Sequence, residues 1–393
     1  MTRATPSPQP SPPRGRGRRR KPSPAWGRGL GEGVARYAVV LLAYLLTALV
    51  PAQATPPADR LAILQRGVNL TNWFRFPARQ DAASIRTYMS DAAIADLRAA
   101  GFTFVRLAVQ PEFLLGATAE RTALLGEAVA RMQRQGLGVI VELHPTTWHL
   151  ETAAADRERL VSTWRLIAPV LAKLNPKLTF PEIVNEPVFS GDEAGWEALQ
   201  RQVLAVLRPA LPSFTLVLTG NDWSSVNGLV GLHPVSDPDV VYTFHFYEPS
   251  VLTTLAEFDP SLDKKALATL PFPVTEPCVR VSVTGETASV MRYYCSQHWD
   301  AAAVANRIAL VADWARRNKA VVLAGEFGAS SDLNAPARLA WLGDVRRALE
   351  AQHIGWALWG YDDRMGFGVP RPPSGRPVLN PALLNALGLH SPG

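Results

Sequence analysis

The sequence predicts an α/β protein built as a (β/α)8 TIM barrel, and two observations support this fold class. Beyond residue 54, short apolar runs alternate with longer runs in which apolar residues recur every three or four positions, the pattern of parallel strands joined by helices. Eight such strand-like runs occur in residues 55–393. A barrel of eight strand–helix units typically needs about 250 residues, so this region has room for one with long loops.

The predicted strands are rich in Val, Ile and Leu along their whole length rather than at alternate positions. Such runs are typical of parallel strands that are covered on both faces. The strands are expected at residues 65–70, 102–109, 138–144, 178–186, 214–220, 240–247, 320–326 and 354–359. A doubly wound open sheet is the alternative, and it is disfavoured because no Gly-rich phosphate-binding loop follows the first strand.

Amphipathic helices are expected between most of these strands. They are predicted at residues 91–100, 120–135, 157–174, 193–211, 301–317 and 336–352. Segment 227–239, after the fifth strand, is rich in Gly, Pro and Asp and predicts only a poor helix. Long connections at 71–90 and 248–300 are expected to shape a cleft, the second as an insertion after strand six. No repeat or linker indicates a second domain within residues 55–393.

The first 54 residues are expected to lie outside this domain. Residues 1–36 hold nine Arg and Lys, one Glu and seven Pro, a basic leader that predicts disorder. Residues 37–50 form an apolar run shorter than the roughly 20 residues of a membrane-spanning helix. Together with the small-x-small end at Ala52-Gln-Ala54, residues 37–54 predict a secretory signal cleaved after Ala54. An uncleaved membrane anchor is the alternative.

The basic leader is long for a secretory signal. We expect translation to begin near Val34, at a non-Met start codon, so that Arg36 forms the basic flank and residues 1–33 are not made. Twin-arginine export through Arg18–Arg20 is a weaker interpretation, because these arginines lie far from the apolar run.

The charge of the chain depends on this leader. Residues 55–393 hold 31 Lys and Arg against 33 Asp and Glu, a net charge of −2, whereas the full sequence is +6. No basic face therefore predicts nucleic-acid binding. The two cysteines, Cys278 and Cys295, are predicted to form a disulfide in an exported chain. A periplasmic or extracellular location is expected.

Polar residues end nearly every predicted strand, and the C-terminal ends of barrel strands meet in one cleft. In chain order they are Asn69, Arg106, His144, Asn185, Glu186, Asn221, His245, Tyr247, Glu326 and Trp359. Two carboxyl groups among them suit cleavage of a glycosidic bond, because one can protonate the leaving oxygen while the other attacks the sugar or activates water. A single Glu is explained more simply as a strand cap; the ordered set favours a site.

Several short motifs resemble glycoside hydrolase family five, the cellulase family. They are Arg66-Gly-Val-Asn-Leu-Thr-Asn-Trp73, Phe104-Val-Arg-Leu107, Glu142-Leu-His-Pro145, Asn185-Glu-Pro187, His245-Phe-Tyr247, Gly325-Glu-Phe-Gly328 and Trp359. Each motif alone is weak, but all occur in the family's order, and the resemblance covers residues 65–390.

The resemblance implies a role for each carboxyl group. Glu186 is expected to be the acid/base and Glu326 the nucleophile of a retaining mechanism, with the carboxyl groups about 5–5.5 Å apart. We expect the nearby negative charge of Glu326 to raise the pKa of Glu186. Arg106 is expected to keep Glu326 ionised, Tyr247 to donate to the same carboxylate, and His245 to lie near the acid/base.

Other residues are expected to support or bind the sugar. Asn185 resembles the family's donor to the sugar 2-hydroxyl. His144 is expected to support either the sugar or Asn185. Asn185 and Glu186 are adjacent, so both can face the cleft only if the strand end departs from regular pleating. Asn69 is placed with the supporting residues, and Trp359 offers a ring face to the sugar. Outer platforms are sought among Trp73, Trp148, Trp223 and Trp299, although packing explains each of them equally well.

Two further acids near the pair, Glu142 and Glu182, are interpreted as buried supports. No His-x-x-x-His spacing occurs, so no metal and no cofactor are expected. The prediction is an exported, monomeric retaining glycosidase of β-linked polysaccharides. Endo-β-1,4-glucanase is favoured by Asn221-Asp-Trp223. Exo-β-1,3-glucanase, β-mannanase and a transglycosylase are the alternatives, with a catalytically silent carbohydrate-binding barrel as a different class.

Overall fold

The computed structural model describes residues 55–370 and 376–392. The predictions for the leader 1–36 and the signal 37–54 lie outside these residues. Within the described part of the chain, no helix is both long enough and apolar enough to cross a bilayer.

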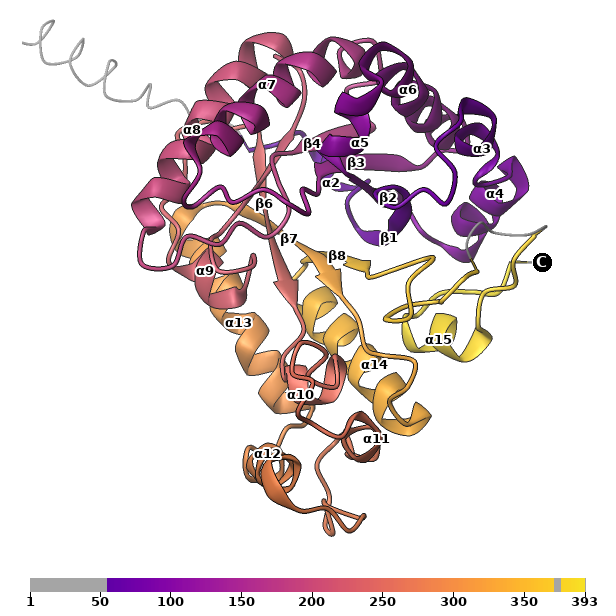
Figure 1. Ribbon diagram of the computed structural model, residues 1–393, viewed down its shortest axis with the longest axis vertical. Helices are drawn as coiled ribbons and strands as arrows, with labels where there is room; N and C mark the ends of the chain where they lie inside the picture. The colour runs from indigo at the N-terminus through magenta and orange to yellow at the C-terminus, as the bar shows by residue number, and fades with distance from the viewer. Residues whose placement is uncertain (1–54, 371–375, 393) are drawn as a thin grey trace, which may run out of the picture. The chain divides into compact units, whose positions relative to one another are not determined.

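Eight parallel strands close into a barrel in the order of the sequence, which confirms the predicted fold class (Figure 1). The strands are β1 (Arg66–Phe74), β2 (Phe104–Val109), β3 (Gly138–Leu143), β4 (Thr179–Glu182), β5 (Leu216–Thr219), β6 (Val240–Phe246), β7 (Val321–Phe327) and β8 (Gly355–Leu358). Each predicted strand is present, but β4 is four residues long and ends well before Glu186.

Helices surround the barrel and follow the strands along the chain (Figure 1). The described helices are α2 (Ala58–Leu61), α3 (Ala82–Thr87), α4 (Asp91–Ala100), α5 (Pro111–Gly116), α6 (Thr118–Arg134), α7 (Ala154–Leu171), α8 (Glu193–Ala210), α9 (Val226–Val230), α10 (Ser250–Thr253), α11 (Lys264–Leu267), α12 (Gly285–Ser296), α13 (Ala301–Asn318), α14 (Ala335–Ala351) and α15 (Pro381–Ala386). The six predicted helices are confirmed within a few residues, and the poor segment after β5 holds only the short α9.

Local sequence sets the ends of the helices, as α4 shows. The Ser90 side chain accepts a hydrogen bond from the Ala93 amide and caps the first turn. Gly101 ends the helix with a φ of +107°, a conformation that suits a residue without a side chain. These two signals explain why the predicted and observed bounds of this helix agree.

An apolar layer fills the lower interior of the barrel. Its members, mostly one from each strand, are Leu64, Phe104, Ile140, Phe180, Val217, Val241, Leu323 and Ala357, and all are buried. Gly67 of β1 has no side chain here because the Phe104 ring occupies that space. The layer is therefore a packed core beneath the strand ends, as expected for this fold.

A polar layer lies directly above the apolar one. Side chains alternate along a strand, so the residue two positions after each apolar member points inward again. On β2 to β7 these positions hold Arg106, Glu142, Glu182, Thr219, Thr243 and Gly325, and on β1 Asn69 lies two positions after Gly67. Apart from the glycine, all are polar and buried, so the change in character marks where the core ends and the floor of a site begins.

The connection after β6 contains the predicted insertion. It forms α10, α11 and α12 rather than an irregular loop, and in Figure 1 α11 and α12 lie beyond the ends of α13 and α14. Cys278 and Cys295 form the predicted disulfide, with Cα atoms 6.0 Å apart, which ties α12 to the segment before it. The other long connection is shorter than predicted, because β1 continues to Phe74 and α3 follows.

Candidate active site

A cavity of about 620 Å³ opens at the C-terminal ends of the strands. It is lined by Arg75, His144, Asn185, Glu186, Trp223, Tyr247, Ser250, Thr254, Glu257, Phe258, Glu326, Trp359, Asp363, Arg364 and Met365. Residues that follow β1, β3, β4, β5, β6, β7 and β8, together with residues of the insertion after β6, therefore surround one space.

The chain leaves regular strand geometry just before Glu186. Strand β4 ends at Glu182, and Glu186 has a φ of +43°, in the left-handed region that non-glycine residues rarely adopt. This departure allows the adjacent side chains of Asn185 and Glu186 both to line the cavity. Such backbone outliers cluster at functional sites.

A register shift turns Glu326 into the cavity. Leu323 belongs to the inner apolar layer, so strict alternation would point Gly325 inward and Glu326 outward. Between β6 and β7, however, the pairing passes from Phe244 with Ala324 to His245 with Glu326, which leaves Gly325 unpaired. The irregularity brings Glu326 to the same face as His245.

The two carboxyl groups lie close together with a histidine beside them. A carboxylate oxygen of Glu186, a carboxylate oxygen of Glu326 and a ring nitrogen of His245 are all within 4.8 Å of one another. His245 Nδ1 is 2.8 Å from Glu186 Oε1 and 3.4 Å from Glu326 Oε2. The separation fits carboxyl groups that act on the same bond from close range, rather than ones spaced to admit a water between them.

Arg106 is the centre of the polar layer and is fully buried. Its five hydrogen bonds use every N–H of the guanidinium. They go to Glu182 at 2.7 and 2.6 Å, Asn69 at 3.0 Å, Glu326 at 2.5 Å and Asn185 at 2.9 Å. A rigid, always charged fork thus fixes one oxygen of Glu326.

Two polar residues in contact with Arg106 are not available to a ligand. Asn69 is enclosed and donates to the carbonyls of Gly325 and Leu358, so it joins β1 to β7 and β8. Both carboxylate oxygens of Glu182 accept hydrogen bonds from Arg106. Neither residue is among those that line the cavity, so Asn69 lies beneath the site, with the supporting residues.

A second chain of contacts orients Asn185. His144 Nδ1 is 2.9 Å from Glu142 Oε1, and His144 Nε2 is 3.2 Å from Asn185 Nδ2. Burial holds the pKa of His144 well below its usual value, so the ring is neutral and donates through Nδ1 to Glu142 while Nε2 accepts from Asn185. The amide orientation is then fixed from both sides, because its oxygen already accepts from Arg106.

Burial sets the protonation of the carboxyl groups. It raises the pKa of Glu186, and the contribution of Glu326 that the sequence suggested is not among the main causes. Burial also raises the pKa of Glu326 to about 7, against the opposing effects of His245 and Arg106. The pKa directions therefore do not separate the two groups, whereas the hydrogen bonds do. Glu326 accepts from Arg106 and from the Tyr247 hydroxyl at 2.9 Å, which favours its anion.

The tryptophans divide between core and cavity. Trp359 and Trp223 line the cavity, and Trp223 is 56% exposed. Trp73 is fully buried and donates to the Ile85 carbonyl, so it is no sugar platform. Trp148 and Trp299 pack against the core.

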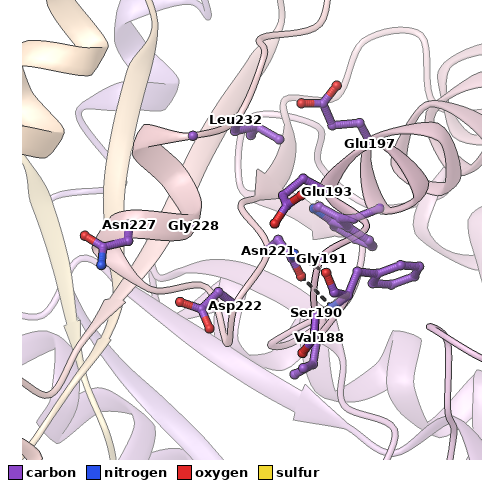
Figure 2. Close-up of a pocket in the computed structure, with 13 residues that line it drawn as sticks. Val188, Ser190, Gly191, Glu193, Glu197, Asn221, Asp222, Asn227, Gly228 and Leu232 are labelled. Atoms are coloured by element: carbon purple, nitrogen blue, oxygen red, sulfur yellow. Dashed lines mark hydrogen bonds between the residues drawn. The ribbon is translucent and has the colours of Figure 1, made fainter. Parts of the chain in front are cut away.

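Asn221 does not reach the cavity, which corrects the expectation for the fifth strand. Its amide accepts from the Phe189 N–H at 2.7 Å and donates to the Phe189 carbonyl at 2.8 Å. It lines a separate cavity of about 350 Å³ between the loops after β4 and β5. Figure 2 shows Asn221 between Asp222 on one side and Ser190 and Glu193 on the other.

Several residues that line the cavity were absent from the sequence-based prediction, and Arg75 is the one that lies on the connection after β1. Arg75 follows β1 directly, yet the motif around it drew attention only to Asn69 and Trp73. No short pattern marks an arginine after a strand as functional, so the signal comes only from its place in the fold.

A parallel barrel that holds two neighbouring carboxyl groups in a cavity at its strand C-termini has the architecture of a glycoside hydrolase. Residues 64–364 match the family model described as cellulase (glycosyl hydrolase family 5). The match spans most of the chain, which therefore belongs to glycosyl hydrolase family 5 and is a glycoside hydrolase.

Individual relatives agree with this assignment. The chain is 23% identical to endoglucanase 3 of Fibrobacter succinogenes over 332 residues, which cover 76% of this chain and 49% of that protein. It is 22% identical to endoglucanase C of Acetivibrio thermocellus over 75% of this chain and 90% of that one. The chain thus spans about half of the first relative. The solved structure of endoglucanase Cel5A from Thermotoga maritima has the same fold, with a TM-score of 0.70 at 21% identity, covering 85% of this chain and 100% of that one.

Proposed function

We propose that the protein is a retaining endo-β-1,4-glucanase, with Glu186 as acid/base and Glu326 as nucleophile. The observation that carries the proposal is the placement of oxygens of both carboxyl groups within 4.8 Å of each other. Retaining enzymes hold their carboxyl groups close, whereas inverting enzymes separate them by about 6.5–9.5 Å to admit water.

In the first step, Glu326 attacks the anomeric carbon of the sugar while Glu186 transfers its proton to the leaving oxygen. The raised pKa of Glu186 keeps the proton available. About 30% of its side chain is still exposed, so a bound sugar would complete its desolvation. The product of this step is a glycosyl ester on Glu326, and the leaving chain departs with the proton.

In the second step, the Glu186 carboxylate takes a proton from water, and that water attacks the same carbon and releases Glu326. His245 is suited to support both steps, since it lies 2.8 Å from Glu186. Its pKa is lowered to about 4, chiefly by burial, so the ring is neutral at working pH and does not hold Glu186 permanently ionised. Arg106 and Tyr247 hold Glu326 in position throughout.

Asn185 is proposed to bind the 2-hydroxyl of the sugar next to the scissile bond, and Trp359 to stack on that sugar. The contacts with His144 and Arg106 fix the amide in one orientation, which favours a contact that strengthens as the transition state forms. Trp223 is proposed as a platform on the rim, because its exposed ring offers an apolar face.

The names of the two relatives described above, both endoglucanases, favour internal cleavage of a glucan. A structural neighbour described as a hyperthermophilic endo-β-1,4-glucanase in complex with substrate favours the β-1,4 linkage. A β-mannanase is the second candidate, because one structural neighbour from Thermotoga maritima was solved with mannotriose. A transglycosylase uses the same residues, and only its products distinguish it.

The test is reducing-sugar release by residues 55–393 from soluble β-1,4-glucan, β-1,3-glucan and β-mannan, with Glu326→Gln alongside. We expect fragments of intermediate length from β-1,4-glucan, a β-anomer as the first product, and loss of activity in the variant. Stepwise release of one small product would contradict endo action, an α-anomer would contradict retention, and longer oligosaccharides would indicate transfer.

We also propose that residues 37–54 direct export and are removed. A disulfide in the mature region supports an oxidising compartment. N-terminal sequencing of the protein from its native host should begin at Thr55, and an intact N-terminus at Met1 would contradict both the cleavage and the later start.

A further inference from the structure

Arg75 occupies an unusual place in the cavity. It follows the last residue of β1 and lines the same space as Glu186, Glu326 and Trp359. Strand β1 pairs with β8, so the closure of the barrel brings this arginine beside Trp359, which follows β8.

Two aromatic rings hold the guanidinium. Its central carbon is 4.6 Å from the centroid of the Phe76 ring and 5.5 Å from that of Trp359. Contacts of this kind orient a planar cation without using its N–H groups. The fork of Arg75 is therefore positioned but still able to donate.

No polar partner within the described chain satisfies this fork. Nε is enclosed and has no acceptor, and no hydrogen bond or ion pair joins Arg75 to another described residue. Other partly buried arginines differ: Arg307 forms a two-pronged pair with Glu248 at 2.5 and 2.6 Å, and Arg208 pairs with Asp237 at 2.7 Å.

The charge of Arg75 is also poorly compensated. Burial lowers its pKa, and the attraction of Glu142, Glu326, Glu186 and Asp363, none of which forms an ion pair with Arg75, is the smaller effect. A buried cation without a close counter-charge is costly, and a ligand that supplies an acceptor relieves that cost.

The position and charge of Arg75 indicate which ligand group it can bind. A sugar hydroxyl accepts one N–H but leaves the charge uncompensated, whereas a carboxylate accepts two N–H groups in the plane of the fork and neutralises the charge. We propose that Arg75 makes the cleft selective for β-glycans whose sugar next to Trp359 carries a carboxylate. This rests on the proposed function, since it assumes that a β-glycan binds over Trp359. The carboxylate belongs to a hexuronic acid or to an ether-linked acid group.

The experiment compares carboxymethyl cellulose with hydroxyethyl cellulose of matched chain length and substitution. For wild type, Arg75→Gln and Arg75→Lys, kcat/KM is measured on both polymers. We expect the ratio of carboxymethyl to hydroxyethyl activity to fall about tenfold in Arg75→Gln, as when one charge-assisted contact is lost. Arg75→Lys keeps the positive charge but not the planar fork, so its ratio of carboxymethyl to hydroxyethyl activity should lie between those of wild type and Arg75→Gln. A β-1,4-linked glucuronic acid oligosaccharide, assayed in parallel, distinguishes the hexuronic source from the ether.

Arg79→Gln is the matched control, since Arg79 lies in the same connection, is largely exposed and pairs with Asp81; its ratio should equal that of wild type. Binding without turnover is measured with the Glu326→Gln variant, alone and combined with Arg75→Gln. The measured quantity is the retardation of each protein in native gels that contain one of the two polymers. An Arg75→Gln variant that weakens both polymers equally, or neither, would overturn the proposal. If no polymer is cut but retardation by carboxymethyl cellulose depends on Arg75, the proposed function fails and this inference stands.

Discussion

At the scale of single residues, the site depends on how hydrogen bonds divide two similar carboxyl groups. Both Glu186 and Glu326 have pKa values raised by burial. Glu326 accepts hydrogen bonds from a guanidinium and a phenol, which favour its anion, whereas Glu186 contacts a neutral imidazole. These different environments support the roles proposed for the two carboxyl groups.

Replacing Glu186 by Gln tests its role as proton donor. Cellulose oligosaccharides need protonation of the leaving oxygen, so their kcat/KM should fall by about 100-fold or more, the range for loss of general acid catalysis. A dinitrophenyl cellobioside leaves without a proton, so its glycosylation step should be nearly unaffected and should lose its alkaline pH limb. A loss of equal size on both substrates would contradict this role.

Replacing Tyr247 by Phe tests the support of Glu326. The variant removes a donor to a buried carboxylate, an interaction of about 1.5–3 kcal/mol, so kcat/KM should fall by about tenfold or more. Because the anion loses a hydrogen bond, the pKa of Glu326 rises above its value of about 7. The acidic limb of the pH profile, where Glu326 becomes protonated as pH falls, should therefore move to higher pH. Tyr293→Phe, at an exposed position, should leave the profile unchanged.

At the scale of elements, regular periodicity predicts the strands and helices but not the irregularities that aim the catalytic side chains. The apolar runs around Leu323 and Ile140 predict their strands correctly, because a strand that is buried on both faces consists almost entirely of apolar residues. The left-handed backbone at Glu186 and the unpaired Gly325 leave no trace in the hydrophobic periodicity of the sequence. Adjacent Asn185 and Glu186 do indicate that an irregularity is needed there, but not its form.

The same limit explains the residues that were misplaced. Asn221 and Asn69 were predicted in the cleft because they end strands, and each instead bridges backbone groups of neighbouring elements. A polar residue at a strand end can either face the cavity or hydrogen-bond to the backbone of a neighbouring element. Its neighbours in the folded structure decide which of the two occurs. Arg75 shows the converse, since its exceptional feature is that no described residue accepts a hydrogen bond from its guanidinium, which no sequence pattern records.

The insertion after β6 yields a prediction about local stability. The disulfide closes a short loop, for which chain entropy gives about 3 kcal/mol of stabilisation. The double variant Cys278→Ser/Cys295→Ser should therefore exchange amide hydrogens faster in residues 248–300 while β1–β8 keep their protection. Uniform loss of protection across the barrel would show that the insertion is not a separate unit of stability.

At the scale of the whole molecule, the barrel interior holds two stacked layers of side chains, one that stabilises the fold and one that supports the site. The lower layer is apolar and closely packed, and the upper layer is a buried polar network around Arg106. The carboxyl groups lie above both, so the network that positions them rests on a rigid base. This arrangement follows from the alternation of side chains along parallel strands in register.

Truncating a ring in the lower layer should lower stability without altering the chemistry of the site. Phe104→Ala removes a fully buried ring and should cost about 3–5 kcal/mol in the free energy of unfolding. Chemical denaturation measures the change. Phe258→Ala is the control, since that ring is 94% exposed and its loss should leave stability within about 0.5 kcal/mol. Equal stability of the two variants would contradict the packed interior.

The central claim, that Glu326 is the nucleophile of a retaining glycosidase, is tested most directly by trapping the intermediate. A 2-fluoro cellobioside with a good leaving group slows the second step more than the first, so the glycosyl-enzyme accumulates and its labelled peptide can be identified by mass spectrometry. We predict one sugar per protein on the peptide that contains Glu326, with activity lost in proportion to labelling. A label on Glu186 or Glu142, or an active enzyme that accumulates no label, would contradict it.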